Sequence, residues 1–471
     1  MKTGKAAKAH SVESLPLDTA TQDKARADAL PSIQKDKLKT YDPAADNVRR
    51  FLELLSERIT RPVAVSLAAC VHCGLCVESC HYALTHPDDP TMTPVYKADQ
   101  IRKIFKRRID WTGRIFPWWV KAGTPRGDED LNRLKNIVFG TCSACRRCTL
   151  NCPMGVDTAI LIRFTRGLLT ELGIVPEGVF NVSRDEWETG NQMAVTPLDF
   201  LETLQWMRDD LRADPKLAGL DIPVDLPGCD FMYTINPREI KFDPRSIAQA
   251  AKIFHLAGER WTLPSAGWDQ TNFGLFSGDD RLGGALARNL YEAAVRLRAG
   301  RIVISECGHG YRSTRWEGYN WAQYDQDLPS ESVVRTLRRY LREERIRADK
   351  TKNDLPVTFH DSCNVARSGG MTEEPRDVLR RVCADFREMT PNRTENYCCT
   401  GGGGLLSMAE YRPLRMEAAA VKARQLEATG AKLVCTICHN CVDGLNDVIK
   451  HYKLDMRVVQ VLELVENALI Y

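Results

Sequence analysis

The sequence has little that would mark it as a membrane-spanning, nucleic-acid-binding or nucleotide-dependent protein. No run of about 18 apolar residues occurs, so no transmembrane helix is predicted. The formal net charge is only +3, which gives no strong electrostatic case for binding nucleic acid. The chain also has no nicotinamide or flavin fingerprint, so any such cofactor would belong to a partner.

Cysteine is the residue type that stands out. The chain has 17 cysteines among 471 residues, an odd number and a share well below the roughly 8–10 % of a small disulfide scaffold. The first 39 residues mix Lys, Asp, Ser and Ala without an apolar core segment or a small-residue cleavage site, which predicts a cytoplasmic protein. Thiols stay reduced in that compartment and collect metal. We therefore expect the cysteines to be metal ligands.

Two cysteine runs in the first third of the chain have the same spacing. Residues 70–80 read CVHCGLCVESC and residues 142–152 read CSACRRCTLNC. This is the bacterial ferredoxin run, in which three thiolates hold one 4Fe–4S cluster and the fourth reaches the other cluster. Zinc would not need two runs of four ligands. The predicted ligands are Cys70, Cys73, Cys76 and Cys152 for one cubane, and Cys142, Cys145, Cys148 and Cys80 for the other.

The segment between these runs is basic and rich in tryptophan. Residues 109–119 read IDWTGRIFPWW and follow Lys103, Lys106, Arg107 and Arg108. Such a segment is typical of a membrane-interface element or of a surface that binds a partner. A hydrophobic cap over a small helical domain is an equally good interpretation, and the alternatives stay open.

The rest of the chain changes from helices to alternating strands and helices at about residue 221. Residues 222–226, 301–305, 356–360 and 432–434 are short apolar segments that predict strands, and a helix is expected over about 405–429. Strand–loop–helix alternation indicates α/β units, whose ligands gather beyond the carboxyl ends of the strands. A cysteine follows each predicted strand, namely Cys229, Cys307, Cys363 and Cys435.

These landmarks indicate an internal duplication. The C-terminal copy has Cys363, the pair Cys398-Cys399, and Cys435-x-x-Cys438. The N-terminal copy has Cys229, then Thr271-Asn272 in the place of the pair, then Cys307 with Gly310 where the last cysteine would be. One copy therefore keeps five thiols and its sister keeps two.

A single cysteine, Cys398-Cys399-Thr400-Gly401 and Cys435-x-x-Cys438-His439 together resemble the cysteine-rich CCG domain. Behind a two-cluster ferredoxin module, over about residues 50–471, the chain resembles the D subunit of heterodisulfide reductase. The closest resemblance is to the DsrK type, the K subunit of the DsrMKJOP membrane complex, and its Hmc and Tmc relatives. This implies a multidomain α+β fold, in which a helical HdrC-like ferredoxin domain precedes two duplicated α/β HdrB-like CCG modules, the first degenerate.

The resemblance also implies a third centre. A non-cubane 4Fe–4S cluster would be held by Cys363, Cys398, Cys399, Cys435 and Cys438. Gly401, Gly402 and Gly403 would let the backbone approach that cluster and offer N–H groups at a helix N-terminus. His439 is the best-placed proton donor by sequence, with a purely supporting role as the alternative. The five thiols and His439 form the predicted catalytic site.

Several residues stay without a definite role at this stage. Cys441 lies one helical turn past Cys438 and is either a spare ligand, a redox thiol or a plain buried cysteine. Cys229 and Cys307 are either remnants of a lost second site or, with His309, part of the substrate cleft. Cys383 is expected to pack in the core, and His360 and Asp361 flank the cluster loops.

The expected domains follow from these motifs. They are a flexible tail at 1–45, a two-cluster ferredoxin domain at 46–170, a helical connector at 171–220, a degenerate CCG module at 221–350 and an intact CCG module at 351–471.

The resemblance implies an iron–sulfur subunit of a disulfide oxidoreductase in dissimilatory sulfur metabolism. Electrons would pass through the two cubanes to the non-cubane cluster, where a disulfide or trisulfide of a small sulfur carrier like DsrC is reduced or formed. A cytochrome b-type membrane subunit like DsrM would be a partner and would hold the chain on the inner face of the cytoplasmic membrane. The alternatives are an electron-transfer subunit with the chemistry on a partner, and a flavin-dependent dehydrogenase subunit of the glycolate oxidase iron–sulfur type.

Overall fold

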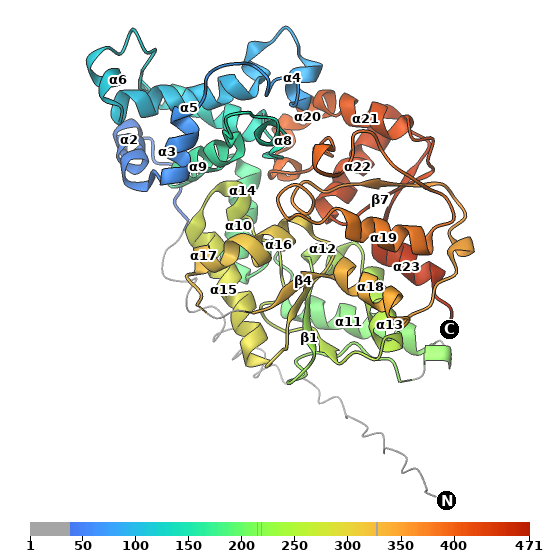
Figure 1. The fold of residues 1–471 in the computed structure, drawn as a ribbon. Coiled ribbons are helices and arrows are strands. Elements are labelled where there is room, and N and C mark those ends of the chain that lie inside the picture. The colour runs from blue at the N-terminus through green and yellow to red at the C-terminus, as the bar shows by residue number, and fades with distance from the viewer. Residues whose placement is uncertain (1–37, 214, 218, 326–327) are drawn as a thin grey trace, which may run out of the picture.

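The computed structural model describes residues 38–213, 215–217, 219–325 and 328–471. The predicted N-terminal tail therefore lies outside the described residues up to position 37. Figure 1 shows a helical region at one end of the molecule and two α/β units that pack against it and against each other. Parallel sheets combined with a separate helical region confirm the predicted fold class, whereas the domain boundaries stay predictions.

Helices form the whole region that carries the two ferredoxin runs. They are α2 (Asn47–Arg58), α3 (Arg61–Ala68), α4 (His81–Thr85), α5 (Pro94–Arg108), α6 (Trp111–Ile115), α7 (Asp128–Lys135), α8 (Arg147–Leu150) and α9 (Thr158–Thr170). Asp157 starts α9 by accepting hydrogen bonds from the N–H groups of Ala159 and Ile160. The apolar face of α9 is buried in a core that also takes in Phe276 and Leu405 from the two α/β units. The connector follows as α10 (Glu177–Thr189) and α11 (Pro197–Arg212).

The first α/β unit is built on a four-stranded parallel sheet of order β2-β1-β3-β4. Its strands are β1 (Phe231–Thr234), β2 (Trp261–Thr262), β3 (Ile302–Ile304) and β4 (Ser330–Ser332). Its helices are α12 (Pro237–Lys241), α13 (Arg245–Leu256), α14 (Gly274–Ser277), α15 (Asp280–Arg296), α16 (Gly308–Arg312), α17 (Gly318–Ala322) and α18 (Val333–Arg342).

The second α/β unit repeats this arrangement with the order β6-β5-β7-β8, again all parallel. Its strands are β5 (Val357–His360), β6 (Phe386–Arg387), β7 (Leu433–Thr436) and β8 (Arg457–Gln460). Its helices are α19 (Glu373–Val382), α20 (Arg412–Ala418), α21 (Ala420–Glu427), α22 (His439–Tyr452) and α23 (Val461–Ala468). The identical strand order supports the duplication inferred from the cysteine spacing.

Two predicted strands differ from the structure in ways that matter for the sites. Residues 222–226 form only an isolated bridge from Val224 to Leu263, because Pro223 has no N–H to donate and Asp225 has a left-handed φ of 54°. The real strand, β1, begins after Cys229, so this cysteine lies at the amino end of the sheet and not at the carboxyl end. The strand predicted at 432–434 extends to Thr436 and takes Cys435 into the sheet.

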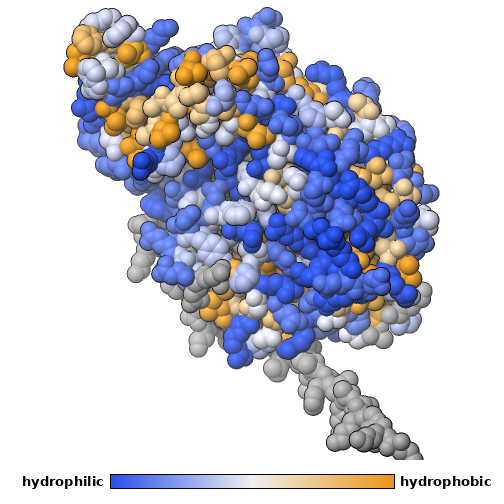
Figure 2. Space-filling view, in the orientation of Figure 1, coloured by the Kyte–Doolittle hydropathy of each residue, from blue (hydrophilic) through white to orange (hydrophobic). Residues whose placement is uncertain are grey.

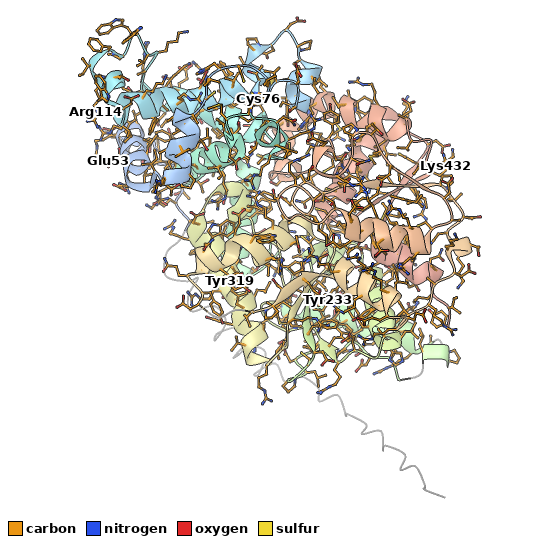
Figure 3. The ribbon with its side chains drawn as sticks, in the orientation of Figure 1. Glu53, Cys76, Arg114, Tyr233, Tyr319 and Lys432 are labelled. Carbon is orange, nitrogen blue, oxygen red and sulfur yellow. The ribbon has the colours of Figure 1, made fainter. Side chains whose placement is uncertain are left out.

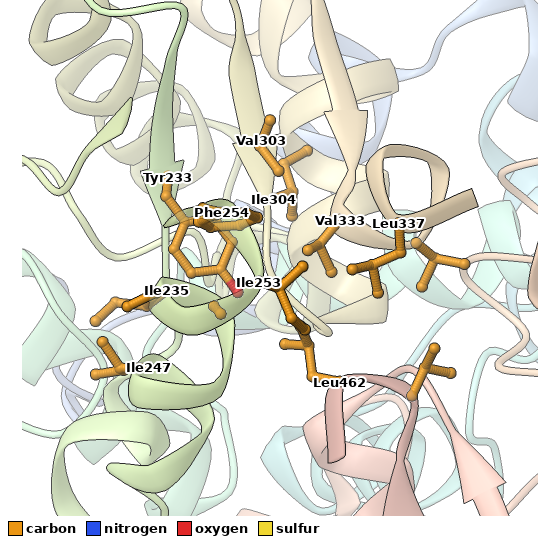
Figure 4. Close-up of a cluster of buried hydrophobic side chains, with 14 of the residues drawn as sticks. Tyr233, Ile235, Ile247, Ile253, Phe254, Val303, Ile304, Val333, Leu337 and Leu462 are labelled. Carbon is orange, nitrogen blue, oxygen red and sulfur yellow. The ribbon is translucent and has the colours of Figure 1, made fainter. Parts of the chain in front are cut away.

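The two α/β units share one hydrophobic core. The buried cluster includes β1 and β3 of the first unit together with Val357, Cys435 and Leu462 of the second. Figure 4 shows Leu462 of α23 lying beside Ile253 of α13. Because apolar area is removed from water across this junction, the two units stabilise each other. Within the described ranges, no helix has both the length and the apolar character needed to cross a membrane.

Candidate iron–sulfur sites

The first ferredoxin run meets the last cysteine of the second run at one pocket. Cys70, Cys73, Cys76 and Cys152 line it together, and Cys73 is exposed to solvent. Burial, and after it the nearby thiols of Cys70, Cys152 and Cys73, together raise the pKa of the Cys76 thiol to about 11. Thiols that oppose each other's ionisation in this way are close enough to share a cation.

The second run meets the last cysteine of the first run. Cys80, Cys142, Cys145 and Cys148 line a second pocket. The pKa of Cys148 is held well above its usual value by burial and by the charges of Cys145, Cys80 and Cys142. Each pocket thus includes the fourth cysteine of the other run, and Cys148 lines both pockets. The two exchanged ligand sets stay a prediction.

The two loops curve in the same way. His72 and Ala144, each just before the second cysteine of its run, have φ angles of 55° and 52°, and Gly74 and Arg146, just after it, have 84° and 64°. This repeated left-handed backbone turns the thiols toward one centre and leaves backbone N–H groups pointing at sulfur. Two such contacts are from Ala144 N to Cys142 Sγ and from Val156 N to Cys152 Sγ, both 3.4 Å.

Five thiols gather at the carboxyl end of the second sheet. They are Cys363, Cys398, Cys399, Cys438 and Cys441, and we call them the five-thiol site. The Sγ atoms of Cys399 and Cys441 are 3.2 Å apart, and Thr400 N donates to Cys398 Sγ at 3.2 Å. Hydrogen bonds from the thiols of Cys398 and Cys441 hold the pKa of Cys399 well below its usual range. Four of the five are buried and Cys363 is partly exposed.

Cys435, predicted as one of the five ligands, does not lie with them. Successive side chains of a strand point to opposite faces, and Cys435 shares its face with Leu433 and Ile437 in the large core. Its pKa is raised by burial, then by Glu306, Cys383 and Glu463, with no thiol of the five-thiol site among the causes. Cys441, whose role was open from sequence, takes the fifth place because Cys438 caps α22 and Cys441 lies one turn further on.

The internal duplication already indicated that Cys441, and not Cys435, belongs with Cys438. Cys307 caps α16 after β3 just as Cys438 caps α22 after β7. Aligning the two helix starts places Gly310 opposite Cys441, whereas the sequence prediction placed Gly310 opposite Cys438. The aligned pair is therefore Cys438-x-x-Cys441.

The histidines also differ from the prediction. His439 Nε2 lies 3.2 Å from Glu239 Oε2 of the first unit, and although burial lowers its pKa, the carboxylates of Glu239 and Glu306 raise it overall. Two other histidines face the thiols instead. His309 Nδ1 lies 3.5 Å from Cys307 Sγ, and the same imidazole lowers the pKa of Cys438. The ring of His360 lies within 4.8 Å of the sulfurs of Cys399 and Cys441. His360 Nε2 is buried without a hydrogen-bond partner among the described residues.

The second ferredoxin pocket adjoins the five-thiol site. Cys145 hydrogen-bonds with Cys398 and packs against its cluster of thiols. A Cβ on Gly403 would lie 2.7 Å from Ser143 O, so glycine is what lets the two cysteine loops touch. The residues after this glycine run form short 3₁₀ turns, Leu405–Ser407 and Ala409–Tyr411, so the expected helix N-terminus is not there.

A fully buried arginine holds this junction together. Arg166 of α9 donates to the carbonyls of Val138, Cys142, Phe276 and Gly403 at 2.7–3.0 Å. Burial lowers its pKa to about 10, and Cys142 is the leading group that opposes this. Arg166 thus joins the ferredoxin region to both α/β units. Its positive charge lies near Cys142, where thiolate ligands would carry negative charge.

A cavity of about 780 Å³ leads to the same junction. Its lining includes Ser143 of the second ferredoxin loop, Asn364 next to Cys363, and Gly403. Arg312, which also lines the cavity, donates to Asn364 Oδ1 at 3.4 Å. A small substrate or a protein tail can therefore reach Asn364, which follows Cys363, the most exposed member of the five-thiol site.

The donor set fits iron–sulfur clusters. All three sites consist of thiols, the soft ligands that iron–sulfur clusters use. The five-thiol site has one more thiol than a cubane requires. The ring of buried His360 lies beside its sulfurs, and the N–H of Thr400 donates to Cys398 Sγ. Such outer contacts orient ligands and tune the potential of a centre.

Comparison with known proteins defines the class. Residues 66–156 match the 4Fe-4S dicluster domain family, and residues 357–446 match the CCG cysteine-rich domain family. The chain is therefore an iron–sulfur protein that combines a dicluster domain with a CCG domain.

Curated relatives extend this resemblance over most of the chain. It is 26 % identical to the Hdr-like menaquinol oxidoreductase iron-sulfur subunit 2 of Archaeoglobus fulgidus, with 89 % of this chain and 83 % of the relative covered. It is also 26 % identical to the D subunit of the dihydromethanophenazine:CoB–CoM heterodisulfide reductase of Methanosarcina mazei, over 88 % and 97 % of the two chains. These matches confirm the predicted resemblance to the D subunit of heterodisulfide reductase, and they support an iron–sulfur oxidoreductase subunit.

Proposed function

We propose that this chain is the catalytic iron–sulfur subunit of a DsrK-like complex, which reduces or forms a disulfide or trisulfide at the five-thiol site. The observation that carries the proposal is the cavity, because its lining includes Asn364, the chain neighbour of the partly exposed Cys363, and so gives a sulfur substrate an approach to one edge of that site. A protein that only relayed electrons would not need such an approach.

The proposed cofactors are two cubane 4Fe–4S clusters and one non-cubane 4Fe–4S cluster, which supply one-electron transfer when bound. The proposed ligands are the two exchanged sets of four cysteines and the five-thiol site with Cys441 in place of Cys435. The contact between Cys145 and Cys398 supports an order in which the second cubane is the neighbour of the non-cubane centre.

Breaking a disulfide takes two electrons and two protons, so the site also needs proton donors. His309, whose imidazole lowers the pKa of Cys438 and contacts Cys307 Sγ at 3.5 Å, replaces His439 as the proposed donor on this side. Gly308 allows this approach, because a Cβ there would lie 3.0 Å from Cys438 Sγ and 2.5 Å from Ser362 Oγ. The first α/β unit, although it keeps only Cys307 at its own carboxyl-end site, thereby supplies a side chain to the active site of the second.

The proposed substrate is a small thiol protein like DsrC, and the proposed partners include a cytochrome b-type membrane subunit like DsrM. These follow from the resemblance to DsrK and place the chain on the inner face of the cytoplasmic membrane. A second candidate is electron transfer for a flavoprotein partner. It is favoured by the 22 % identity, over 82 % of this chain and 56 % of the relative, to the EtfAB:quinone oxidoreductase of Syntrophomonas wolfei.

Replacing Cys399 by Ser tests the proposal in the purified complex. Serine is a poorer iron ligand than thiolate, so the variant should lose the spectroscopic signal of the third centre and all disulfide turnover. Both cubanes should stay reducible by dithionite, which is the internal control. Full disulfide turnover in this variant would overturn the proposal and favour the electron-transfer candidate.

A further inference from the structure

Large hydrophobic side chains stand exposed at the far end of the ferredoxin region. Trp111, Trp118 and Trp119 have exposed fractions of 67 %, 76 % and 75 %, and Ile115 and Phe116 are exposed beside them. We call these five residues and the cations described below the tryptophan tip. Figure 2 shows hydrophobic residues gathering at this end of the molecule, where Figure 1 places α6. The structure thereby excludes the hydrophobic-cap interpretation, because a cap would bury these rings.

The tip has a defined local structure. Asp110 caps α6 by accepting a hydrogen bond from Thr112 N, and Phe116 packs edge-on against both Trp118 and Trp119. Gly113 is packed so closely on α5 that a Cβ there would lie 2.2 Å from Lys106 O. The aromatic rings are therefore held out from the body of the protein by a turn that α5 supports.

Positive charge surrounds these rings. Residues 103–121 contain six lysines or arginines and a single acidic residue, Asp110. The cations are Lys103, Lys106, Arg107, Arg108, Arg114 and Lys121. In the part of the chain that the structure describes, the ion pairs leave all six without a carboxylate partner, whereas Arg102, the preceding cation on α5, is paired with Asp99. Arg107 and Arg114 instead donate to backbone carbonyls of the tip, which keeps their charge at its base.

We propose that the tryptophan tip binds the surface of an anionic lipid bilayer directly. Tryptophan is the residue that settles at the boundary between headgroups and acyl chains, and Lys and Arg beside it attract anionic headgroups. Both features are present, and the unpaired charge has the sign that complements such a surface. A protein partner would have to supply an apolar patch together with matching carboxylates. An anionic bilayer offers apolar acyl chains and negatively charged headgroups over its whole surface.

Lipid binding at this place would also orient the first cubane site. Ala98 of α5 lines the first ferredoxin pocket, and α5 ends at Arg108, next to the tip. Ten residues of α-helix span about 15 Å. Figure 3 shows the same arrangement, with Arg114 at the outer end of the ferredoxin region and Cys76 nearer the body. The tip would thus keep the first ferredoxin pocket close to the membrane surface.

Sedimentation of the full chain with vesicles tests this proposal without any measurement of activity. We expect the chain to bind vesicles of phosphatidylcholine with about 30 mol % phosphatidylglycerol, and to bind pure phosphatidylcholine much more weakly. The double variant Trp118→Ala/Trp119→Ala should lower the partition coefficient by roughly tenfold or more. Trp206→Ala, an exposed tryptophan on α11, is the matched control and should change nothing.

A second pair of variants separates the charges from the rings. Lys103→Gln/Lys121→Gln should weaken binding only to the anionic vesicles, and added salt should have the same effect on the unmodified chain. Iron content equal to that of the unmodified protein shows that the variants are folded. The proposal is overturned if the folded chain does not bind anionic vesicles. This outcome includes the case in which the tip variants lose only their binding to a membrane subunit.

Discussion

The two α/β units have the same strand order and different chemistry at the carboxyl ends of their strands. In the second unit, the loops after β5 and β7 and the loop with the cysteine pair bring five thiols together. In the first unit, Thr271 and Asn272 occupy the place of the pair, and Gly310 stands where Cys441 stands in the second. Only Cys307 is left there, with Asn236 Nδ2 and Gly310 N donating to its sulfur.

Hydrogen bonds have replaced metal ligation in the first unit. Asp269 accepts from Thr271 N and Oγ1, Asn272 donates to Gly283 O, and Gln270 bonds to Ser305. A site without a cluster must satisfy its buried polar groups internally, and this network pairs most of them, although Asn272 Oδ1 has no hydrogen-bond partner among the described residues. The first unit still supports the second, since Glu306 accepts from the N–H groups of Val461 and Leu462 at the start of α23. The degenerate first unit can thus be retained because it packs against the site of the second unit and supports it.

The largest effect on stability is expected in the intact unit, at Arg376. This fully buried side chain forms ion pairs with Asp361, close to Cys363, and with Glu388. Replacing it by leucine would leave Asp361 as an unpaired buried charge, and we expect a loss of about 3–5 kcal/mol in the free energy of unfolding. Urea denaturation measures this value.

The matched control for that experiment lies on the same helix. Arg381 is partly exposed and pairs with Asp377 four residues earlier. Arg381→Leu should cost less than about 1 kcal/mol, because exposed ion pairs contribute little. Equal losses for the two variants would show that the buried ion pair near Cys363 has no special role.

A pH dependence of intermediate size is expected from the degenerate unit. Burial raises the pKa of Asp269 to about 7, although its hydrogen bonds with Thr271 and Gln192 oppose the shift. The folded chain then holds a proton that the unfolded chain releases near pH 4. Stability should therefore fall as pH rises from about 4 to 7, by about 2–4 kcal/mol from this residue, and level off above that range.

Asp269→Asn removes the titrating group and serves as the comparison. Chemical denaturation at several pH values should show a smaller fall between pH 4 and 7 in the variant than in the unmodified chain. Parallel curves for the two proteins would mean that Asp269 is ionised throughout, contrary to the raised pKa.

The smallest effect is expected at Cys229. This buried cysteine precedes β1 and lies at the amino end of the sheet, away from the carboxyl-end sites. Cys229→Ala should lower stability by about 1 kcal/mol and leave the iron content and all cluster signals unchanged. Loss of a cluster in this variant would show that Cys229 is a ligand and would remove the contrast between the two units.

The sequence predicted those features that depend on local spacing. The apolar segments at 301–305 and 356–360 correspond to β3 and β5. The two ferredoxin runs predict exchanged sets of cysteines, and the structure places the fourth cysteine of each run at the pocket of the other. The strand predicted at 222–226 was wrong, because this apolar segment contains Pro223 and only resembles a strand. The real strand begins at Phe231, nine residues after the start of the predicted one.

The remaining differences depend on contacts between distant parts of the chain. Whether Cys435 faces the site or the core depends on where β7 ends, and a shift of one residue reverses the face. His439 and His309 have similar positions in their units, yet only packing between the units directs one to Glu239 and the other to Cys438. The exposure of the tryptophan tip is likewise a property of the folded surface.

The central claim is that the third centre uses Cys441 and not Cys435. Electron paramagnetic resonance and iron analysis of the purified Cys441→Ser and Cys435→Ser variants test it most directly. We predict that Cys441→Ser loses the signal of the third centre and about four iron atoms, while Cys435→Ser keeps both. Loss of that signal and iron in Cys435→Ser, with Cys441→Ser unaffected, would contradict the account.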